Sequence, residues 1–97
     1  MDLELLWEVV RAIPVGRVMS YGDVGQALRN PMSGFLVGRR MRSSPSDVPW
    51  WRVVAKNGTL PVGKLDPHLE CLQSQRLRQE GVEIQEGRID MHRFGWR

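Results

Sequence analysis

The chain has 97 residues, of which 41% are hydrophobic and 26% are charged, which suits one domain around one hydrophobic core. This composition argues against a disordered chain, and no apolar run approaches the ~18 residues that a membrane span needs. The single cysteine excludes an intramolecular disulfide, and the acidic start differs from a secretion signal. We therefore expect a single domain over residues 1–97, located in the cytoplasm.

The net charge of +3 is concentrated in the middle of the chain. Residues 1–16 sum to −2 and residues 65–97 to −1, whereas six arginines and two lysines oppose two aspartates in residues 17–64, a local charge of +6. Arginine-rich segments suit forked contacts with phosphates and bases. A nucleic-acid partner is one interpretation of this segment, and a solvated basic surface is the other.

Two short helices are predicted in the first part of the chain. Apolar residues at helical spacing indicate the first: Leu3, Leu6, Trp7 and Val10. It ends at the Pro14-Val15-Gly16 turn. Ser20 to Asp23 resembles a capping box, which predicts a second helix over residues 21–28 that ends ahead of Pro31.

Residues 32–42 are predicted to form a third helix with two unlike faces. One side carries Gly34, Val37 and Met41, and the other carries a stripe of Phe35, Arg39 and Arg42. Two short helices joined by a tight turn, the second with an aromatic and basic stripe, indicate a helix-turn-helix whose stripe faces DNA. Alternatively, Phe35 is simply exposed or packs on a neighbouring element.

With the patterns of the second half added, the whole chain is expected to be a mainly α domain with short β-hairpin elements. A Trp50–Val54 segment leads to an Asn57-Gly58 tight turn, and residues 82–90 alternate around a Glu-Gly turn. A fourth helix is expected over residues 67–80, with Leu69, Leu72 and Leu77 on one face. Cys71 is expected there as a buried or half-buried structural thiol. The two histidines lack partners at metal-ligand spacing, so we expect no metal and no cofactor.

Short segments match one protein family in order and spacing between residues 13 and 81. They are Ile13–Val18, Ser20–Val24, Asn30-Pro31 with Val37-Gly38, Pro49 with Arg52–Val54, and Glu80-Gly81. Together they resemble the C-terminal, DNA-binding domain of the O6-alkylguanine-DNA alkyltransferases. The resemblance implies a winged helix-turn-helix-like fold that docks in the minor groove and turns a nucleotide out of the duplex.

The chain departs from the enzymes of that family between Pro49 and Arg52, where they carry a cysteine and a histidine. Here the two positions are Trp50 and Trp51. The enzymes accept the alkyl group on the cysteine as a thiolate, and an indole offers no comparable nucleophile. The pattern resembles the alkyltransferase-like proteins. This implies a monomer that binds O6-alkylguanine in duplex DNA without alkyl transfer, at the nucleoid when bound, and flags the lesion for nucleotide excision repair proteins.

The resemblance also implies the residues of the site. The lesion pocket would be lined by Tyr21, Trp50, Trp51, Arg52 and Val53, and the DNA contacts would come from Ser33, Gly34, Phe35, Arg39 and Arg42. Phe35 stands where the family places an arginine finger, so either Phe35 or Arg39 fills the gap left by the flipped base. Small residues such as Gly34 would permit close backbone approach to the duplex.

Three alternatives stay open. Adjacent tryptophans are often core residues or a partner surface, which would leave no ligand pocket. The protein could be a residual alkyltransferase that uses Cys71 as acceptor. It could also be a sequence-specific winged-helix regulator that reads base edges in the major groove.

Overall fold

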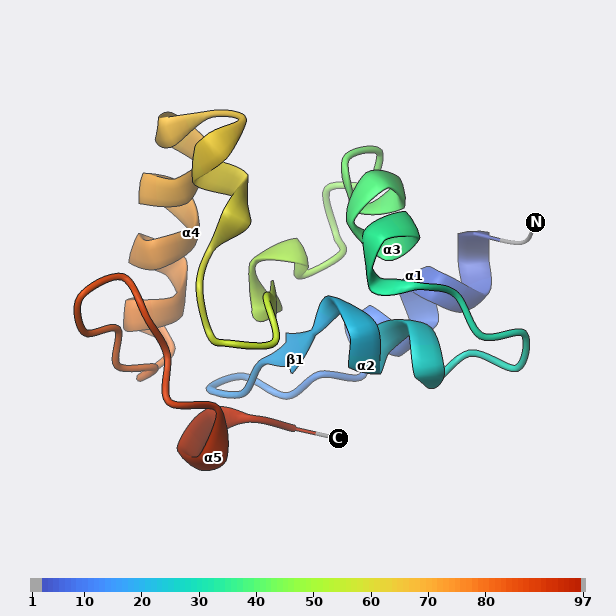
Figure 1. The fold of residues 1–97 in the computed structure, drawn as a ribbon, viewed down its shortest axis with the longest axis horizontal. Helices are drawn as coiled ribbons and strands as arrows, with labels where there is room; N and C mark the ends of the chain where they lie inside the picture. The colour runs from blue at the N-terminus through green and yellow to red at the C-terminus, as the bar shows by residue number, and fades with distance from the viewer. Residues whose placement is uncertain (1–2, 97) are drawn as a thin grey trace.

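The structure, a computed structural model, describes residues 3–96 and is mainly helical, as expected (Figure 1). The elements in chain order are α1 (Leu3–Arg11), β1 (Met19–Ser20), α2 (Tyr21–Gln26), α3 (Gly34–Met41), the 3-10 helix η1 (Trp50–Arg52), β2 (Val53–Val54), the 3-10 helix η2 (Pro61–Lys64), α4 (Pro67–Gln79) and α5 (Met91–Phe94). No helix within residues 3–96 is long and apolar enough to cross a membrane.

Two clusters of buried side chains lie on either side of the short β-pair. The first is built by α1, α2 and α3, and the second by α4 and the chain after it, which stand at opposite ends of Figure 1. Strands β1 and β2 pair in parallel, with Met19 opposite Val53. Met19 and Val53 belong to the first cluster, whereas Val18 and Val54 belong to the second. Since successive strand residues point to opposite faces, the β-pair separates the two cores.

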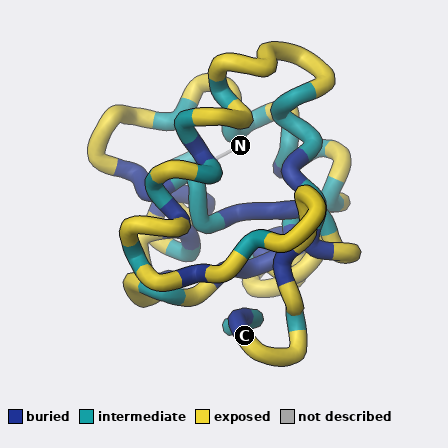
Figure 2. Tube along the Cα trace, turned by 90° about the vertical axis from the view of Figure 1, so that its left-hand side faces the viewer, coloured by how far each residue is buried: buried dark blue, intermediate teal, exposed yellow. Residues whose placement is uncertain are grey.

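Figure 2 shows the buried stretches running through the middle of the molecule, with exposed loops around them. Helix α1 contributes three side chains to the first cluster: Leu6 and Val10 are fully buried and Trp7 is 5% exposed. Their spacing along the sequence is the helical spacing that predicted this element. The first helix is therefore confirmed.

Helices α2 and α3 are each shorter than predicted, α2 at its C-terminal end and α3 at both ends, and each is capped by a serine at its start. The Ser20 hydroxyl accepts a hydrogen bond from Asp23 N at 3.0 Å, and the Ser33 hydroxyl accepts one from Leu36 N at 3.2 Å. Helix α3 therefore begins after Ser33, and Met32 is a buried residue of the preceding loop. That loop crosses α2 so closely that a Cβ at Gly25 would overlap the Met32 carbonyl. Only glycine fits there.

The expected hairpins are reduced to tight turns with isolated bridges. At the first turn, Gly58 has φ +86° and its N–H donates to Ala55 O at 2.8 Å. The second turn closes with an antiparallel bridge between Gln85 and Arg88, and a further bridge joins Thr59 to Arg88. The two turns thus pair with each other, and the only regular ladder within residues 3–96 is the parallel β1–β2 pair.

The prediction for Cys71 is wrong, because its thiol is exposed on α4. Helix α4 turns a different side to the core, with Gln73 1% exposed and Leu77 fully buried. At 100° per residue, position 71 lies far around the helix from position 73. The predicted extent of this helix differs from the observed one only at its last residue, since Glu80 is the C-cap.

Candidate nucleic-acid interface

The outer face of α3 carries the stripe that the sequence predicted. Phe35 is 77% exposed, and Arg39 and Arg42 are exposed beside it, whereas Val37 is fully buried on the other side of the helix. The Arg39 guanidinium carbon lies 6.0 Å from the centre of the Phe35 ring. An exposed ring beside a cation combines a stacking surface with a charge that attracts phosphate.

The small residues of this helix have packing roles that the sequence analysis did not anticipate. Ser33 caps α3, and a Cβ added at Gly34 would lie only 3.1 Å from Gly22 N on α2. Gly34 therefore lets the two helices approach closely. Contact of Ser33 and Gly34 with DNA stays a prediction.

Tyr21 begins α2 and lies against α3. A Cβ built on Gly38 would stand 3.9 Å from the nearest carbon of the Tyr21 ring. Tyr21 is half-buried against the first core, and burial raises the pKa of its hydroxyl. The phenol is therefore protonated at neutral pH and can donate a hydrogen bond to an anionic group.

Trp50 and Trp51 stand together on η1, between the two cores. Their ring centres are 6.1 Å apart and the planes meet at 86°, an edge-to-face arrangement. Both rings are half-buried. The indole N–H of Trp50 makes no hydrogen bond to any residue in the described part of the chain, so this donor is free for a ligand.

Trp51 is held in place by α4. Its indole Nε1 donates to Glu80 Oε2 at 2.9 Å, and the Arg76 guanidinium lies 4.7 Å from the ring centre. The Arg52 guanidinium lies 5.5 Å from the same ring. Trp51 is therefore fixed by the protein itself, unlike Trp50.

Arg52 and Glu80 form an ion pair whose side chains are 12% and 14% exposed. Arg52 NH2 lies 2.7 Å from Glu80 Oε2, and Arg52 NH1 donates to the Ile13 carbonyl at 2.8 Å. The Gly16 N–H also points at the carboxylate, at 3.4 Å from Oε1. The pair thus joins the end of α4 to η1 and to the loop after α1.

The pKa of Glu80 reflects this arrangement. Burial alone would raise it, but hydrogen bonds from Arg52, Trp51 and the Gly16 backbone, together with the charge of Arg52, outweigh burial and hold it below the ordinary value of 4.5. Glu80 is therefore ionised at neutral pH. Glu80 matches the family in sequence, but its partners are distant along the chain and its role is visible only in the fold.

The structure places Tyr21 against α3 and the tryptophan pair on η1, which packs on α4. Two other residues predicted for the pocket have structural roles instead. Val53 is 1% exposed in the first core, and Arg52 is engaged by Glu80. Their contact with a base stays a prediction.

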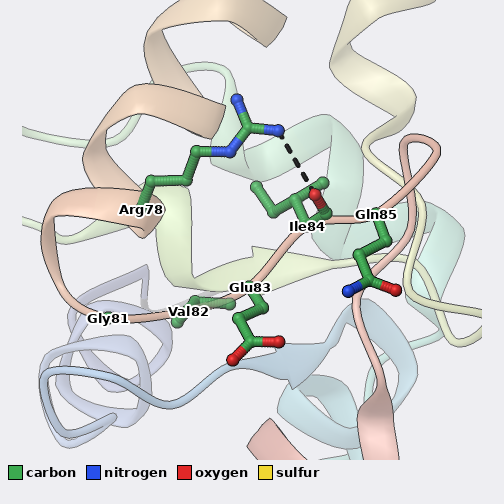
Figure 3. A pocket seen from close by; sticks show the side chains of 6 residues that line it. All are labelled: Arg78, Gly81, Val82, Glu83, Ile84 and Gln85. Carbon is green, nitrogen blue, oxygen red and sulfur yellow. Dashed lines mark hydrogen bonds between the residues drawn. The ribbon is translucent and has the colours of Figure 1, made fainter.

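Two surface hollows lie elsewhere. One follows α4 and is lined by residues 78 and 81–85, where Arg78 NH2 donates to Ile84 O at 3.3 Å (Figure 3). The other lies between the start of α2 and the C-terminal segment, and includes Asp23, Lys56 and Trp96. Neither hollow includes a residue predicted for the lesion pocket. No cluster of three or more metal-ligating side chains occurs among residues 3–96.

Comparison with known proteins places this arrangement in a family. Residues 4–82 match the family model described as the 6-O-methylguanine DNA methyltransferase, DNA binding domain. The DNA base-flipping protein of Escherichia coli K12 is 38% identical over 94 residues, which cover 94% of this chain and 70% of that protein. Alkyltransferase-like protein 1 of Schizosaccharomyces pombe is 33% identical over 81 residues, covering 81% of this chain and 74% of the relative.

A solved structure supports the same assignment. The crystal structure of S. pombe Atl1 in complex with damaged DNA containing O6-carboxymethylguanine superimposes with a TM-score of 0.87 at 28% identity, over 97% of this chain and 93% of that chain. The chain therefore belongs to the family of the 6-O-methylguanine DNA methyltransferase DNA-binding domain, and within it is similar to the alkyltransferase-like and base-flipping proteins.

Proposed function

We propose that this protein binds O6-alkylguanine in duplex DNA by turning the damaged nucleotide out of the stack, and that it transfers no alkyl group. Family membership supports DNA binding. The relative named a DNA base-flipping protein supports the extrusion step, and the likeness to Atl1 bound to O6-carboxymethylguanine DNA supports the choice of lesion.

The observation that carries the proposal is the state of Trp50. The resemblance in sequence aligns it with the acceptor cysteine of the family's enzymes, and its side chain is half-buried with an N–H that makes no hydrogen bond in the described chain. An indole can stack on a base and donate one hydrogen bond, but it cannot accept an alkyl group as a thiolate does. The one cysteine, Cys71, lies exposed on α4.

The exposed face of α3 supplies the duplex contacts in this proposal. Phe35 enters the stack at the position of the extruded base, because its ring is largely exposed and apolar wedges unstack neighbouring bases. Arg39 and Arg42 contact phosphates, and the protonated Tyr21 hydroxyl donates to the phosphate of the flipped nucleotide. Extrusion costs least for a poorly paired base, which contributes to selectivity for damage.

We propose further that the protein acts as a monomer and that its complex with the lesion marks the site for nucleotide excision repair. The resemblance to alkyltransferase-like proteins supports this role. Because no chemical step removes the alkyl group, the lesion would stay intact for as long as the complex lasts. A repair protein can then recognise a persistent, distorted complex.

The proposal is tested by competition between two duplexes of one sequence, with and without a single O6-methylguanine. We expect the lesion-bearing duplex to displace the undamaged one. A fluorescent base analogue beside the lesion would report extrusion directly. Equal binding of both duplexes, with strong preference for one particular sequence, would instead identify a winged-helix regulator.

Replacement of Trp50 by cysteine alone is expected to give no efficient methyltransferase. The new thiol would have no general base beside it, because the indole N–H of Trp51 only donates a hydrogen bond. In this chain that N–H already donates a hydrogen bond to Glu80. Intact-mass measurement after incubation with O6-methylguanine DNA checks the result.

A matched variant makes this test sharper. The double variant Trp50→Cys/Trp51→His adds an imidazole that Glu80 can orient, so its methyl uptake should exceed that of the single variant. Rapid uptake by Trp50→Cys alone would show that the pocket activates a thiol without the histidine.

A further inference from the structure

Gln73 is a polar side chain on the buried face of α4. Its side chain is 1% exposed, one helical turn before the fully buried Leu77. Burial of an amide is costly unless its hydrogen bonds are made. A glutamine in this position therefore needs a reason.

The amide of Gln73 holds the backbone of the tryptophan segment. Its Nε2 donates to the carbonyls of Trp51 and Val53, each at 3.1 Å. These carbonyls belong to the middle residue of η1 and the first residue of β2, on either side of Arg52. Both donors of the Gln73 amide are used, and both carbonyls would lose these partners without it.

The acceptor end of the same side chain is unpartnered. Oε1 of Gln73 is buried and makes no hydrogen bond within residues 3–96. Reversing the amide would point this oxygen at two carbonyl oxygens, which repel it. The two donated hydrogen bonds therefore fix the orientation of the side chain, and they are what keeps it in the core.

We propose that Gln73 is a positioning residue that sets the geometry of the Trp50–Trp51 pair for the damaged base. Glu80 fixes the ring of Trp51, and Gln73 fixes the main chain that carries both rings. The ring of Trp50 has no hydrogen bond of its own in the described chain, so its position depends on that main chain. This inference rests on the proposed lesion binding.

The variants that test it are Gln73→Leu, which removes all polar atoms, and Gln73→Glu, which keeps the shape and leaves one donor at most, on the protonated carboxyl. We expect the ratio of affinities for lesion-bearing and undamaged duplex to fall about tenfold in each, as for loss of hydrogen bonds to buried carbonyls. Affinity for undamaged duplex should change less than about twofold, because α3 carries those contacts. Leu77→Ala is the matched control: it destabilises the same helix by a cavity and should leave the ratio unchanged.

A measurement without DNA separates this inference from the proposed function. The edge-to-face indoles should give an exciton signal in the circular dichroism spectrum that is reduced by both Gln73 variants and kept by Leu77→Ala. An unchanged signal in the Gln73 variants would overturn the positioning role, whatever the protein binds. If the natural protein itself binds lesion-bearing and undamaged duplex equally well, the proposed function alone is overturned.

The natural protein provides a test that does not depend on folding of a variant. In nuclear magnetic resonance spectra, the side-chain amide protons of Gln73 should exchange with water far more slowly than those of exposed Gln75. Equally fast exchange at the two residues would contradict the hydrogen bonds on which the inference depends.

Discussion

Replacing Glu80 by alanine is expected to lower the free energy of unfolding by about 3–5 kcal/mol, because it leaves a buried guanidinium without its partner. Arg52 is 12% exposed and gives both its Nε and NH2 groups to this carboxylate. Trp51 and the Gly16 N–H lose their acceptor in the same variant. Urea denaturation of the two proteins measures the difference.

Glu83→Ala is the matched control. It removes an ion pair with Arg93 whose side chains are 53% and 59% exposed. Such pairs contribute about 0–1 kcal/mol in water. A loss of stability in Glu80→Ala no larger than that of the control would show that the buried cluster does not join the two cores.

The same carboxylate makes stability depend on pH. The folded pKa of Glu80 lies below its unfolded value, so its contribution is complete above about pH 5. That contribution decreases as the pH falls through 4.5 and is lost below the folded pKa. The difference in stability between the natural protein and Glu80→Gln should therefore shrink with acidification. A difference that stays constant would contradict the ion pair.

Phe35→Ala is expected to weaken binding to lesion-bearing duplex by about 1–3 kcal/mol, the scale of stacking between a base and an aromatic ring. Because the side chain is 77% exposed, its removal should lower the stability of the folded protein very little. The salt dependence of binding should barely change, because no charge is removed. Leu65→Ala removes another exposed apolar side chain, 62% exposed on the chain before α4, and should have no effect on binding.

Arg42→Ala is the comparison variant on the same helix. We expect it to weaken DNA binding in a different way from Phe35→Ala. Loss of a phosphate contact weakens damaged and undamaged duplex alike and reduces the salt slope by about one. Titrations at several salt concentrations distinguish the two variants. Normal extrusion by Phe35→Ala, with loss of extrusion in Arg39→Ala, would assign the wedge to Arg39 instead.

The sequence predicted the elements whose cause is local. Helical spacing placed α1 and the stripe on α3, and serine caps predicted the start of α2. A period of 3.6 residues decides which side of a helix is buried, so Phe35 could be recognised as exposed from its neighbours alone. The burial of Cys71 was wrongly predicted because Leu72 was taken as part of the buried side of α4. The helix instead buries the side that carries Gln73.

The partners of the tryptophan segment could not be predicted in this way. Glu80 and Trp51 are 29 positions apart, and Gln73 and Trp51 are 22 apart, so only the tertiary fold brings them together. A polar residue within the apolar face of a helix was the available signal for Gln73. The difference between the two tryptophans depends on these distant contacts: the indole N–H of Trp51 is hydrogen-bonded to Glu80, and that of Trp50 is not hydrogen-bonded in the described chain.

The most direct test of the account is to incubate the protein with duplex DNA containing O6-methylguanine, then determine the intact mass of the protein and the lesion content of the DNA. A methylated-DNA–protein-cysteine methyltransferase serves as the positive control. We predict stable binding, an unchanged protein mass and full recovery of the lesion, because in the proposed function Trp50 stands in place of the acceptor thiol. A protein heavier by one methyl group, with loss of O6-methylguanine from the DNA, would contradict binding without transfer and point to Cys71 as acceptor.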